Sequence, residues 1–406
     1  MILQSIIGMV AVLIGAFLSY AFHFYMVRSL PPSVYGDLSL IIGFLTIILV
    51  PTGSLQTVLA REVAKLGNQE GRILQFLRGY AKNMIVYGII LAILAFFLSF
   101  AIGFVFNDQN LVLPLQLVSL SIPMAFLLSL ANGYFQGREK IGKLSILMVI
   151  NPAIKLAAGF LLVYAGFGLL GASASLVISP LAVLILVGAI FLKHKNKIQK
   201  GIKHKLDSHK PFLFILATNV LLMIFLYLDL FFVKYYLGSE GAGFYNVADI
   251  TAKVMMFAVG GITMVFLPKS SKLNMQTHRP QIKGLLAKAV MLMLPIFLAF
   301  LIFPEQIISI FYTSKYLSAL APFRILTVGM FAYAIFTILL NLSWSQNREK
   351  APLVFSSVAL VADALLLFYL IPVYGLMGAA LSTTISSIGL LAFLGIFLKK
   401  SFGKKN

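Results

Sequence analysis

The amino-acid sequence predicts an all-α protein that crosses a membrane twelve times, as two bundles of six helices. Three observations lead to this fold class. Hydrophobic residues make up 60% of the 406 residues and charged residues only 11%, whereas soluble proteins have about 45–50% and about 25%. The apolar residues form runs long enough to span a bilayer. The two halves of the chain also share sequence motifs at matching positions.

The predicted spans follow from length. A helix rises about 1.5 Å per residue, so a hydrocarbon layer about 30 Å thick requires about 20 apolar residues. Twelve runs meet this requirement: 2–27, 36–59, 83–106, 111–131, 144–166, 169–192, 212–236, 250–268, 286–303, 324–344, 352–371 and 375–398. The first run is too long for the apolar part of a signal peptide, so it is predicted to be the first span.

Positive charge falls on one side of this topology. With the N-terminus inside, 26 of the 32 Lys and Arg lie in the connections on that side, which are 60–82, 132–143, 193–210, 269–288, 345–351 and the tail from 399. Lys and Arg are enriched in cytoplasmic loops, so both termini of this multi-pass protein of the cell (inner or plasma) membrane are expected to be cytoplasmic. The net charge of +20 is then explained by cytoplasmic Lys and Arg that set the topology and contact anionic lipid. No nucleic-acid partner is therefore expected.

An internal duplication divides the chain into two halves. The first motif below recurs at an offset of 210 residues, the second at 207 and the third at 210. They are QGREK (136–140) with QNREK (346–350), FGLLGASAS (167–175) with YGLMGAALS (374–382), and Val34-Tyr35 with Phe244-Tyr245.

The duplication predicts six-helix lobes at 1–192 and 212–406, joined by a basic cytoplasmic linker at 193–211. Because six is even, the lobes enter the membrane from the same side, and a pseudo-two-fold axis along the membrane normal is expected to relate them. Paired bundles of this kind are typical of transporters, which bind substrate between the halves.

Enzyme signatures are missing from the sequence. No HExxH or GxxxxGK[ST] motif occurs, and the absence of Cys excludes thiolate chemistry. No connection between spans exceeds about 20 residues, which is too short for a soluble catalytic domain of about 50 residues or more. Neither catalysis, a metal nor a cofactor is therefore predicted.

Two ionisable residues lie deep in predicted spans, where charge is costly. Lys155 and Asp363 are 208 residues apart and occupy near-equivalent positions in the two halves. They are interpreted either as a charge pair that holds or releases the halves, with Lys155 alternatively attracting an anionic headgroup, or as separate structural groups. Asn151 precedes Lys155 by four residues and shares its helix face, beside Pro152.

Further polar residues lie nearer the outer ends of predicted spans. Asp229 is either a cation or proton site, or the partner of a nearby Lys such as Lys234 or Lys253. Asp249 and Lys253 are spaced i, i+4 at the start of the eighth predicted helix, which favours local neutralisation. His23 and Arg28 are either ordinary interfacial residues or part of an outward cavity.

Four segments resemble a known family. They are RSLPPSVYGDLSL (28–40), DLFFVKYYLGSEGAGFYNVADI (229–250), GYFQGREK (133–140) and GFGLLGASASLVIS (166–179). With them, nearly the whole chain is similar to the polysaccharide-biosynthesis (Wzx-type) flippases of the MOP transporter superfamily. The motifs are structural turns, so they indicate the superfamily better than the substrate.

The resemblance implies a MATE-like, two-lobed exporter that moves a polyprenyl-(pyro)phosphate-linked oligosaccharide to the outer leaflet by alternating access. Lys155, Arg28, Lys253 and Arg324 are the candidate cations for the pyrophosphate, because they lie outside the topology-setting loops. Proton or Na⁺ coupling and polysaccharide polymerases or assembly proteins as partners are further expectations.

One alternative function is left open. A cation-coupled multidrug or small-molecule antiporter of the MATE type shares the twelve-helix plan, and Asp229 or Asp363 would be its coupling site. Lipid II flippases of the superfamily typically have two more helices than this chain accommodates.

Overall fold

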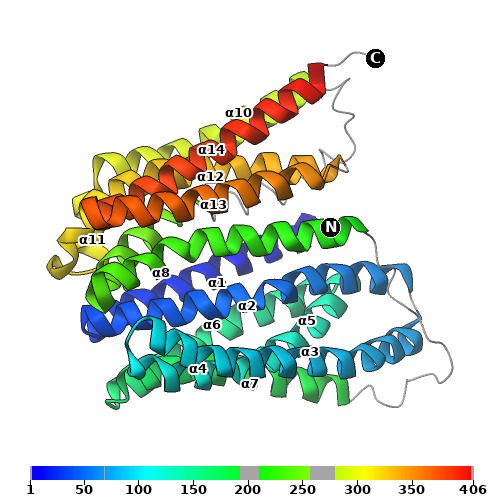
Figure 1. Ribbon diagram of the computed structural model, residues 1–406. Coiled ribbons are helices and arrows are strands. Elements are labelled where there is room, and N and C mark those ends of the chain that lie inside the picture. Colours follow the sequence, from blue (N-terminus) through cyan, green and yellow to red (C-terminus); the bar gives the residue numbers. More distant parts are fainter. Residues whose placement is uncertain (1, 68, 193–209, 257–278, 347, 404–406) are drawn as a thin grey trace. The chain divides into compact units, whose positions relative to one another are not determined.

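The computed structural model describes residues 2–67, 69–192, 210–256, 279–346 and 348–403. Within these ranges every regular element is a helix (Figure 1). The chain divides into two compact units, Met1–Ser208 and His209–Asn406. The predicted linker, 193–211, lies outside the described residues except for its last two.

The first unit contains the helices of the N-terminal half. They are α1 (Ile2–Ser29), α2 (Pro32–Lys65), α3 (Glu70–Val105), the 3₁₀ helix η1 (Gln109–Leu111), α4 (Val112–Ser119), α5 (Ser121–Gly137), α6 (Ile141–Tyr164) and α7 (Gly168–Leu192). Short turns join consecutive long helices, so sequence neighbours run in opposite directions. The main packing pairs are α1 with α6, α2 with α5, α3 with α5, and α6 with α7.

The second unit contains the helices of the C-terminal half. They are α8 (Lys210–Ala252), α10 (Arg279–Ile302), α11 (Pro304–Phe311), the 3₁₀ helix η3 (Ser314–Ala319), α12 (Leu320–Ser345), α13 (Lys350–Tyr374) and α14 (Leu376–Gly403). Here α12 packs along α14, α13 along α14, α8 along α13, and α10 along α12. Between α10 and α11 the chain bends by 84°.

Helix α8 folds back on itself at Gly238. A straight helix of its 43 residues would be about 65 Å long, roughly twice the thickness of the hydrocarbon layer. Gly238 has φ 72° and ψ −173°, a backbone conformation that is almost restricted to glycine. The side chains of Asp229 and Tyr245 meet at 2.7 Å across the fold, whereas 16 residues of straight helix would separate them by about 24 Å. Residues 210–237 are therefore a first arm and residues 239–252 a second arm.

The folded α8 explains how the two units correspond. Its first and second arms occupy the sequence positions of α1 and α2, given the offset of about 210 residues. The pair α1 with α6 then matches α8 with α13, α6 with α7 matches α13 with α14, and α3 with α5 matches α10 with α12. The duplication read from short motifs thus extends to the packing within each unit.

Most predicted spans coincide with helices. Among the described residues, ten helices are long and apolar enough to cross a membrane, or eleven if the bent pair α10–α11 is one span. Eleven of the twelve predicted runs fall on these helices. Helix α8 enters this number as one span, although it consists of two arms. The predicted span 250–268 lies outside the described residues from 257 onward.

Two predicted boundaries were wrong. The connection predicted at 60–82 is mostly helical, because α2 runs to Lys65 and α3 begins at Glu70. Lys and Arg are good helix formers, so a helix continues past the point where the chain leaves hydrocarbon. The helix predicted to begin at 250 begins after Gly238 instead, since that glycine, rather than the charged residues, starts the second arm.

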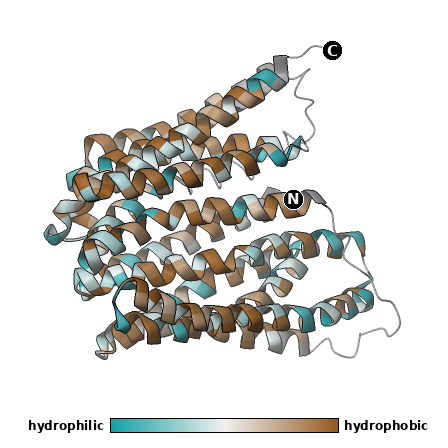
Figure 2. Ribbon diagram, viewed as in Figure 1, coloured by the Kyte–Doolittle hydropathy of each residue, from teal (hydrophilic) through white to brown (hydrophobic). Residues whose placement is uncertain are grey.

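Large hydrophobic side chains cover the outside of both units. Phe97, Phe104, Tyr164 and Tyr369, for example, are exposed, as expected where lipid takes the place of water. Figure 2 shows hydrophobic residues along the lengths of the helices, with hydrophilic residues concentrated toward their ends.

Small residues allow close packing between helices inside each unit. In a bilayer, helices associate mainly through close packing and interhelical hydrogen bonds. A Cβ atom added to Gly137 on α5 would lie 2.3 Å from the carbonyl oxygen of Ala60 on α2. One added to Gly329 on α12 would lie 2.6 Å from the hydroxyl of Thr384 on α14. Glycine is therefore required at both contacts.

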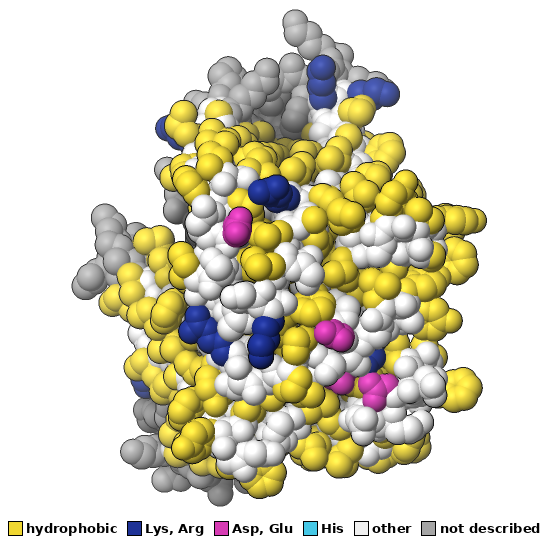
Figure 3. All heavy atoms as spheres, turned by 90° about the vertical axis from the view of Figure 1, so that its left-hand side faces the viewer, with side chains coloured by type: hydrophobic (Ala, Val, Ile, Leu, Met, Phe, Trp, Pro, Cys, Tyr) yellow, Lys and Arg dark blue, Asp and Glu magenta, His cyan; other side chains and the backbone are white. Residues whose placement is uncertain are grey.

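Near α11 in the second unit, Lys315 lies in η3 and Arg324 at the start of α12. Figure 3 views the molecule from that side, and Lys and Arg appear there as scattered groups among hydrophobic and neutral side chains. In the first unit, Arg138, Lys140 and Lys143 lie around the turn between α5 and α6.

Candidate functional site

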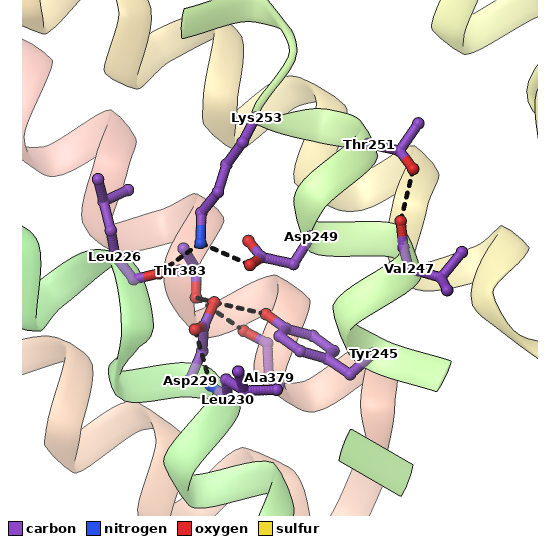
Figure 4. A network of polar contacts seen from close by, with 10 residues as sticks. All are labelled: Leu226, Asp229, Leu230, Tyr245, Val247, Asp249, Thr251, Lys253, Ala379 and Thr383. Carbon is purple, nitrogen blue, oxygen red and sulfur yellow. Dashed lines mark hydrogen bonds and ion pairs between the residues drawn. The ribbon is translucent and has the colours of Figure 1, made fainter. Parts of the chain in front are cut away.

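A buried hydrogen-bond network surrounds Asp229 in the second unit (Figure 4). Asp229 lies on the first arm of α8 and has no exposed surface. Its Oδ2 accepts hydrogen bonds from the Tyr245 hydroxyl at 2.7 Å and the Thr383 hydroxyl at 3.0 Å. Its Oδ1 accepts one from the backbone N–H of Leu230 at 2.7 Å. Because hydrogen bonds to charged groups contribute about 1.5–3 kcal/mol each, three of them offset much of the cost of burying a carboxylate.

An ion pair lies beside this network on the second arm. The ammonium of Lys253 is 2.5 Å from Oδ2 of Asp249, and their side chains are 15% and 1% exposed. Lys253 also donates a hydrogen bond of 2.6 Å to the carbonyl oxygen of Leu226 on the first arm, and its Nζ lies 4.5 Å from the centre of the Tyr227 ring. Both Lys253 and Tyr245 therefore connect the second arm to the first.

These contacts fall on two backbone groups that a regular helix would pair with each other. An α-helix joins each N–H to the carbonyl oxygen four residues earlier, which would join Leu230 to Leu226. Here the Leu230 N–H donates to Asp229, and the Leu226 carbonyl accepts from Lys253. Polar side chains therefore contact the helix backbone at this point, one turn apart.

Asp363 is a second fully buried carboxylate in this unit. It lies on α13, and its Oδ1 accepts a hydrogen bond of 2.7 Å from the Ser382 hydroxyl of α14. Its Oδ2 has no hydrogen-bond partner among the residues that the structure describes. The hydroxyls of Ser386 and Ser387, also on α14, are buried, and Ser386 lies close enough to Asp363 to interact with it.

Helix α14 lies between the two carboxylates. Ser382 binds Asp363 on α13, whereas the next residue, Thr383, binds Asp229 on α8. The segment Ser382–Ser387 (STTISS) supplies the hydroxyls and is buried except for its isoleucine. Carboxylate and hydroxyl oxygens are thus concentrated at one level of the second unit, and oxygen atoms are the ligands that hard cations prefer.

Lys155 lies on α6 in the first unit and is half-buried. Its Nζ is 4.8 Å from the centre of the Phe22 ring on α1, a cation–π contact. Within the described part of the first unit, no acidic group forms an ion pair with Lys155, unlike Lys65, which pairs with Glu62. An ammonium in a membrane span without a carboxylate partner is suited to bind an anion.

His23 lies on α1, next to Phe22, and is buried. Its Nδ1 is 3.2 Å from the hydroxyl of Tyr35 on α2, and it interacts electrostatically with Lys155. His23 and Lys155 therefore belong to one polar cluster of the first unit.

Asn151 has a different partner within the same unit. Ser179 on α7 donates to the Asn151 side-chain oxygen and, at 2.7 Å, to its backbone carbonyl. Pro152 is adjacent, so the polar, proline-containing patch predicted on this helix contributes a link between α6 and α7.

The remaining predicted residues are either exposed to the surroundings or hydrogen-bonded to another side chain. Arg28 near the end of α1 and Arg324 near the start of α12 are both exposed. Lys234 is buried and donates to the Ser239 hydroxyl across the fold at Gly238. Lys155 belongs to the first unit and Asp363 to the second, and their pairing stays a prediction.

Sequence reasoning missed the hydroxyl groups that hold the carboxylates. Tyr245, Thr383 and Ser382 were not among the predicted residues, because uncharged hydroxyl residues are common in apolar helices. Two signals pointed to them: the recurrence of Tyr35 as Tyr245, and the run STTISS within an otherwise apolar span.

Comparison with known proteins places the chain in a family. A family model described as polysaccharide biosynthesis protein matches residues 26–321. The chain belongs to this family. The putative O-antigen transporter of Shigella flexneri is 22% identical over 288 residues, which cover 70% of this chain and 68% of that protein. The probable low-salt glycan biosynthesis flippase Agl15 of Haloferax volcanii is 23% identical over 394 residues, covering 94% and 80%.

Solved structures with the same fold are membrane transporters. A multidrug resistance MATE family transporter of the MOP superfamily, in its inward-facing conformation, has a TM-score of 0.74 and 14% identity, covering 95% of this chain and 94% of that one. The lipid II flippase MurJ, in its inward closed conformation, has a TM-score of 0.73 and 17% identity, covering 98% and 88%. The predicted MATE-like, all-α membrane fold is confirmed, and so is the predicted family of polysaccharide-biosynthesis proteins.

Proposed function

We propose that the protein moves a polyprenyl-(pyro)phosphate-linked oligosaccharide from the cytoplasmic to the outer leaflet of the cell membrane by alternating access. The observation that carries this proposal is the family match over residues 26–321, on a chain whose fold is that of transporters. Two matched relatives are named as a putative O-antigen transporter and a probable low-salt glycan biosynthesis flippase. The likeness to MATE structures is one of fold, so drug export is the weaker alternative.

Lys155 is our strongest candidate for binding the phosphate end of this substrate. Its ammonium lacks an acidic partner in the described part of its unit, and it lies in the span between polar and aromatic neighbours. Lys253 is weaker, because Asp249 already neutralises it. Arg28 and Arg324 are exposed toward the helix ends, where they would meet the headgroup as it enters or leaves.

Asp229 and Asp363 are our candidates for coupling transport to a proton or Na⁺. Both are fully buried, they interact electrostatically, and Oδ2 of Asp363 lacks a partner among the described residues. A bound cation or proton would supply that partner and reduce the repulsion between the two carboxylates. Asn151 and His23 are assigned to the polar lining of the first unit.

The orientation proposed here places both termini in the cytoplasm. The positive-inside distribution of Lys and Arg along the sequence supports it. The glycan delivered to the outer leaflet would then be available to polysaccharide polymerases or assembly proteins, which we propose as partners.

A depletion experiment tests this function in cells. Loss of the protein should cause lipid-linked oligosaccharide to accumulate on the cytoplasmic leaflet, as measured by its resistance to a glycosidase added to intact cells, without a change in drug tolerance. Unchanged lipid-linked oligosaccharide together with increased drug sensitivity would favour the MATE-type antiporter instead.

A further inference from the structure

The two units share a tyrosine that the proposed function does not explain. Tyr35 and Tyr245 are 210 residues apart, the offset of the internal duplication, and neither has exposed surface. Tyr35 follows the turn between α1 and α2, and Tyr245 follows the fold of α8 at Gly238. The two tyrosines therefore occupy equivalent positions on the second helical segment of each unit.

Each tyrosine hydroxyl contacts an ionisable side chain on the preceding helix. In the first unit the partner is His23, at 3.2 Å from its Nδ1. In the second unit it is Asp229, at 2.7 Å from its Oδ2. The partner is a histidine on α1 in one unit and an aspartate on the first arm of α8 in the other. In both units, however, the tyrosine hydroxyl contacts an ionisable side chain.

Packing alone does not account for these hydroxyl groups. Phenylalanine would fill nearly the same volume, and this chain has 35 of them. A buried hydroxyl is costly without a partner, so its retention at both positions points to the bond that it makes.

We propose that Tyr245 is a positioning residue for Asp229, one that sets the affinity of this carboxylate for the coupling cation and links its occupancy to the two arms of α8. Tyr35 holds the equivalent place beside His23. This inference rests on the proposed function. It assigns a role to a residue that does not itself bind substrate.

The chemistry follows from the charge of the carboxylate. While Asp229 is ionised, the Tyr245 hydroxyl donates a charge-assisted hydrogen bond, which is stronger than a neutral one. A proton or Na⁺ bound to Asp229 weakens this hydrogen bond, because it neutralises the negative charge. The bond between the second arm and the first is therefore weaker when the site is occupied.

Other groups near Asp229 also influence its affinity for a proton or Na⁺. Lys253 and Asp249 approach from the second arm, Asp363 from α13 and Thr383 from α14. Of the side chains that donate hydrogen bonds to Asp229, Tyr245 is the one located across the fold at Gly238.

The test measures cation dependence in sealed proteoliposomes containing the full-length protein. The probe is a fluorescent polyprenyl-pyrophosphate oligosaccharide, and its translocation is followed against Na⁺ concentration at fixed pH and against pH at fixed Na⁺. Tyr245→Phe leaves Asp229 ionised with one bond fewer, so the concentration of Na⁺ or protons giving half-maximal rate should fall about tenfold. Tyr333→Phe is the matched control, because it deletes another buried tyrosine hydroxyl of the same unit.

A double-mutant cycle separates positioning from general stability. In an Asp229→Asn background, which lacks the carboxylate, Tyr245→Phe should cause no further change in how translocation depends on Na⁺ or pH. Thr383→Val, which removes the other hydroxyl donor to the same oxygen, should shift half-saturation in the same direction and keeps the test available if Tyr245→Phe folds poorly.

Three results would overturn the inference. They are a Tyr245→Phe variant that changes only the maximal rate, an equal shift in the Asp229→Asn background, and wild-type translocation that depends on neither Na⁺ nor pH. In each of these the wild-type protein still moves the probe, so the proposed function stands. A wild-type protein that moves no probe would refute the proposed function and the inference with it.

Discussion

Removal of the Lys253 ammonium should strongly destabilise the second unit. Lys253 is 15% exposed and forms an ion pair with Asp249, which is 1% exposed, and it also bonds the Leu226 carbonyl. A Lys253→Ala substitution leaves the Asp249 carboxylate buried beside Asp229 without a neighbouring cation. Removing one partner of a buried pair costs about 3–5 kcal/mol, because the remaining charge is uncompensated.

The expected loss is large enough to measure by thermal unfolding. For a unit of about 200 residues, each kcal/mol shifts Tm by about 2–4 °C, so the predicted decrease is on the order of 10 °C. The assay is thermal denaturation of the purified protein in detergent. Lys315→Ala is the control, since Lys315 lies in the same unit and is exposed.

A compensating variant tests the physical reason. Asp249→Asn combined with Lys253→Met removes both charges and keeps most of the side-chain volume, and it should recover at least half of the lost Tm. If Lys253→Ala unfolds at the temperature of Lys315→Ala, or if the double variant is no more stable than Lys253→Ala, the reasoning is refuted.

Three further predictions concern other parts of the chain. Lys155→Gln should abolish most translocation in proteoliposomes without lowering Tm, whereas Lys143→Gln, which is exposed, should retain it; equal activity of both variants would contradict a substrate role. Asp363→Asn should remove the Na⁺ or proton dependence of translocation, and a variant that keeps the wild-type dependence would exclude Asp363 as a coupling site. Gly137→Ala should lower stability by about 1–3 kcal/mol in thermal denaturation because its Cβ would clash with α2, whereas Gly142→Ala, with open space around it, should be nearly neutral.

The fold could be predicted from the sequence because the membrane makes hydrophobic length informative. Runs of about 20 apolar residues located most helices, since backbone groups in hydrocarbon must bond within a helix. Helix ends were less predictable. Lys65 and Glu70 are polar and were assigned to a loop, yet nothing in their chemistry stops a helix from continuing past the bilayer.

The candidate site was predicted only in part. Asp229, Asp363 and Lys155 could be found because a charge in a span is rare and costly. Their partners could not be found, because the hydroxyls of Tyr245 and Ser382 reach the carboxylates only through tertiary packing. The fold at Gly238 was also missed. A single glycine among helix formers does not reveal that the chain reverses there, so Asp249 was assigned to the start of a helix rather than to the end of the second arm.

The central claim is that this chain moves a lipid-linked oligosaccharide across a membrane. The most direct measurement is leaflet accessibility of a fluorescent polyprenyl-pyrophosphate oligosaccharide in sealed proteoliposomes, read out by an impermeant quencher, with and without a proton or Na⁺ gradient. The account predicts protein-dependent transfer from the protected leaflet to the quenched leaflet, and its loss in Lys155→Gln. No transfer in vesicles where a cationic dye exchanges against the gradient would contradict the account and favour an antiporter.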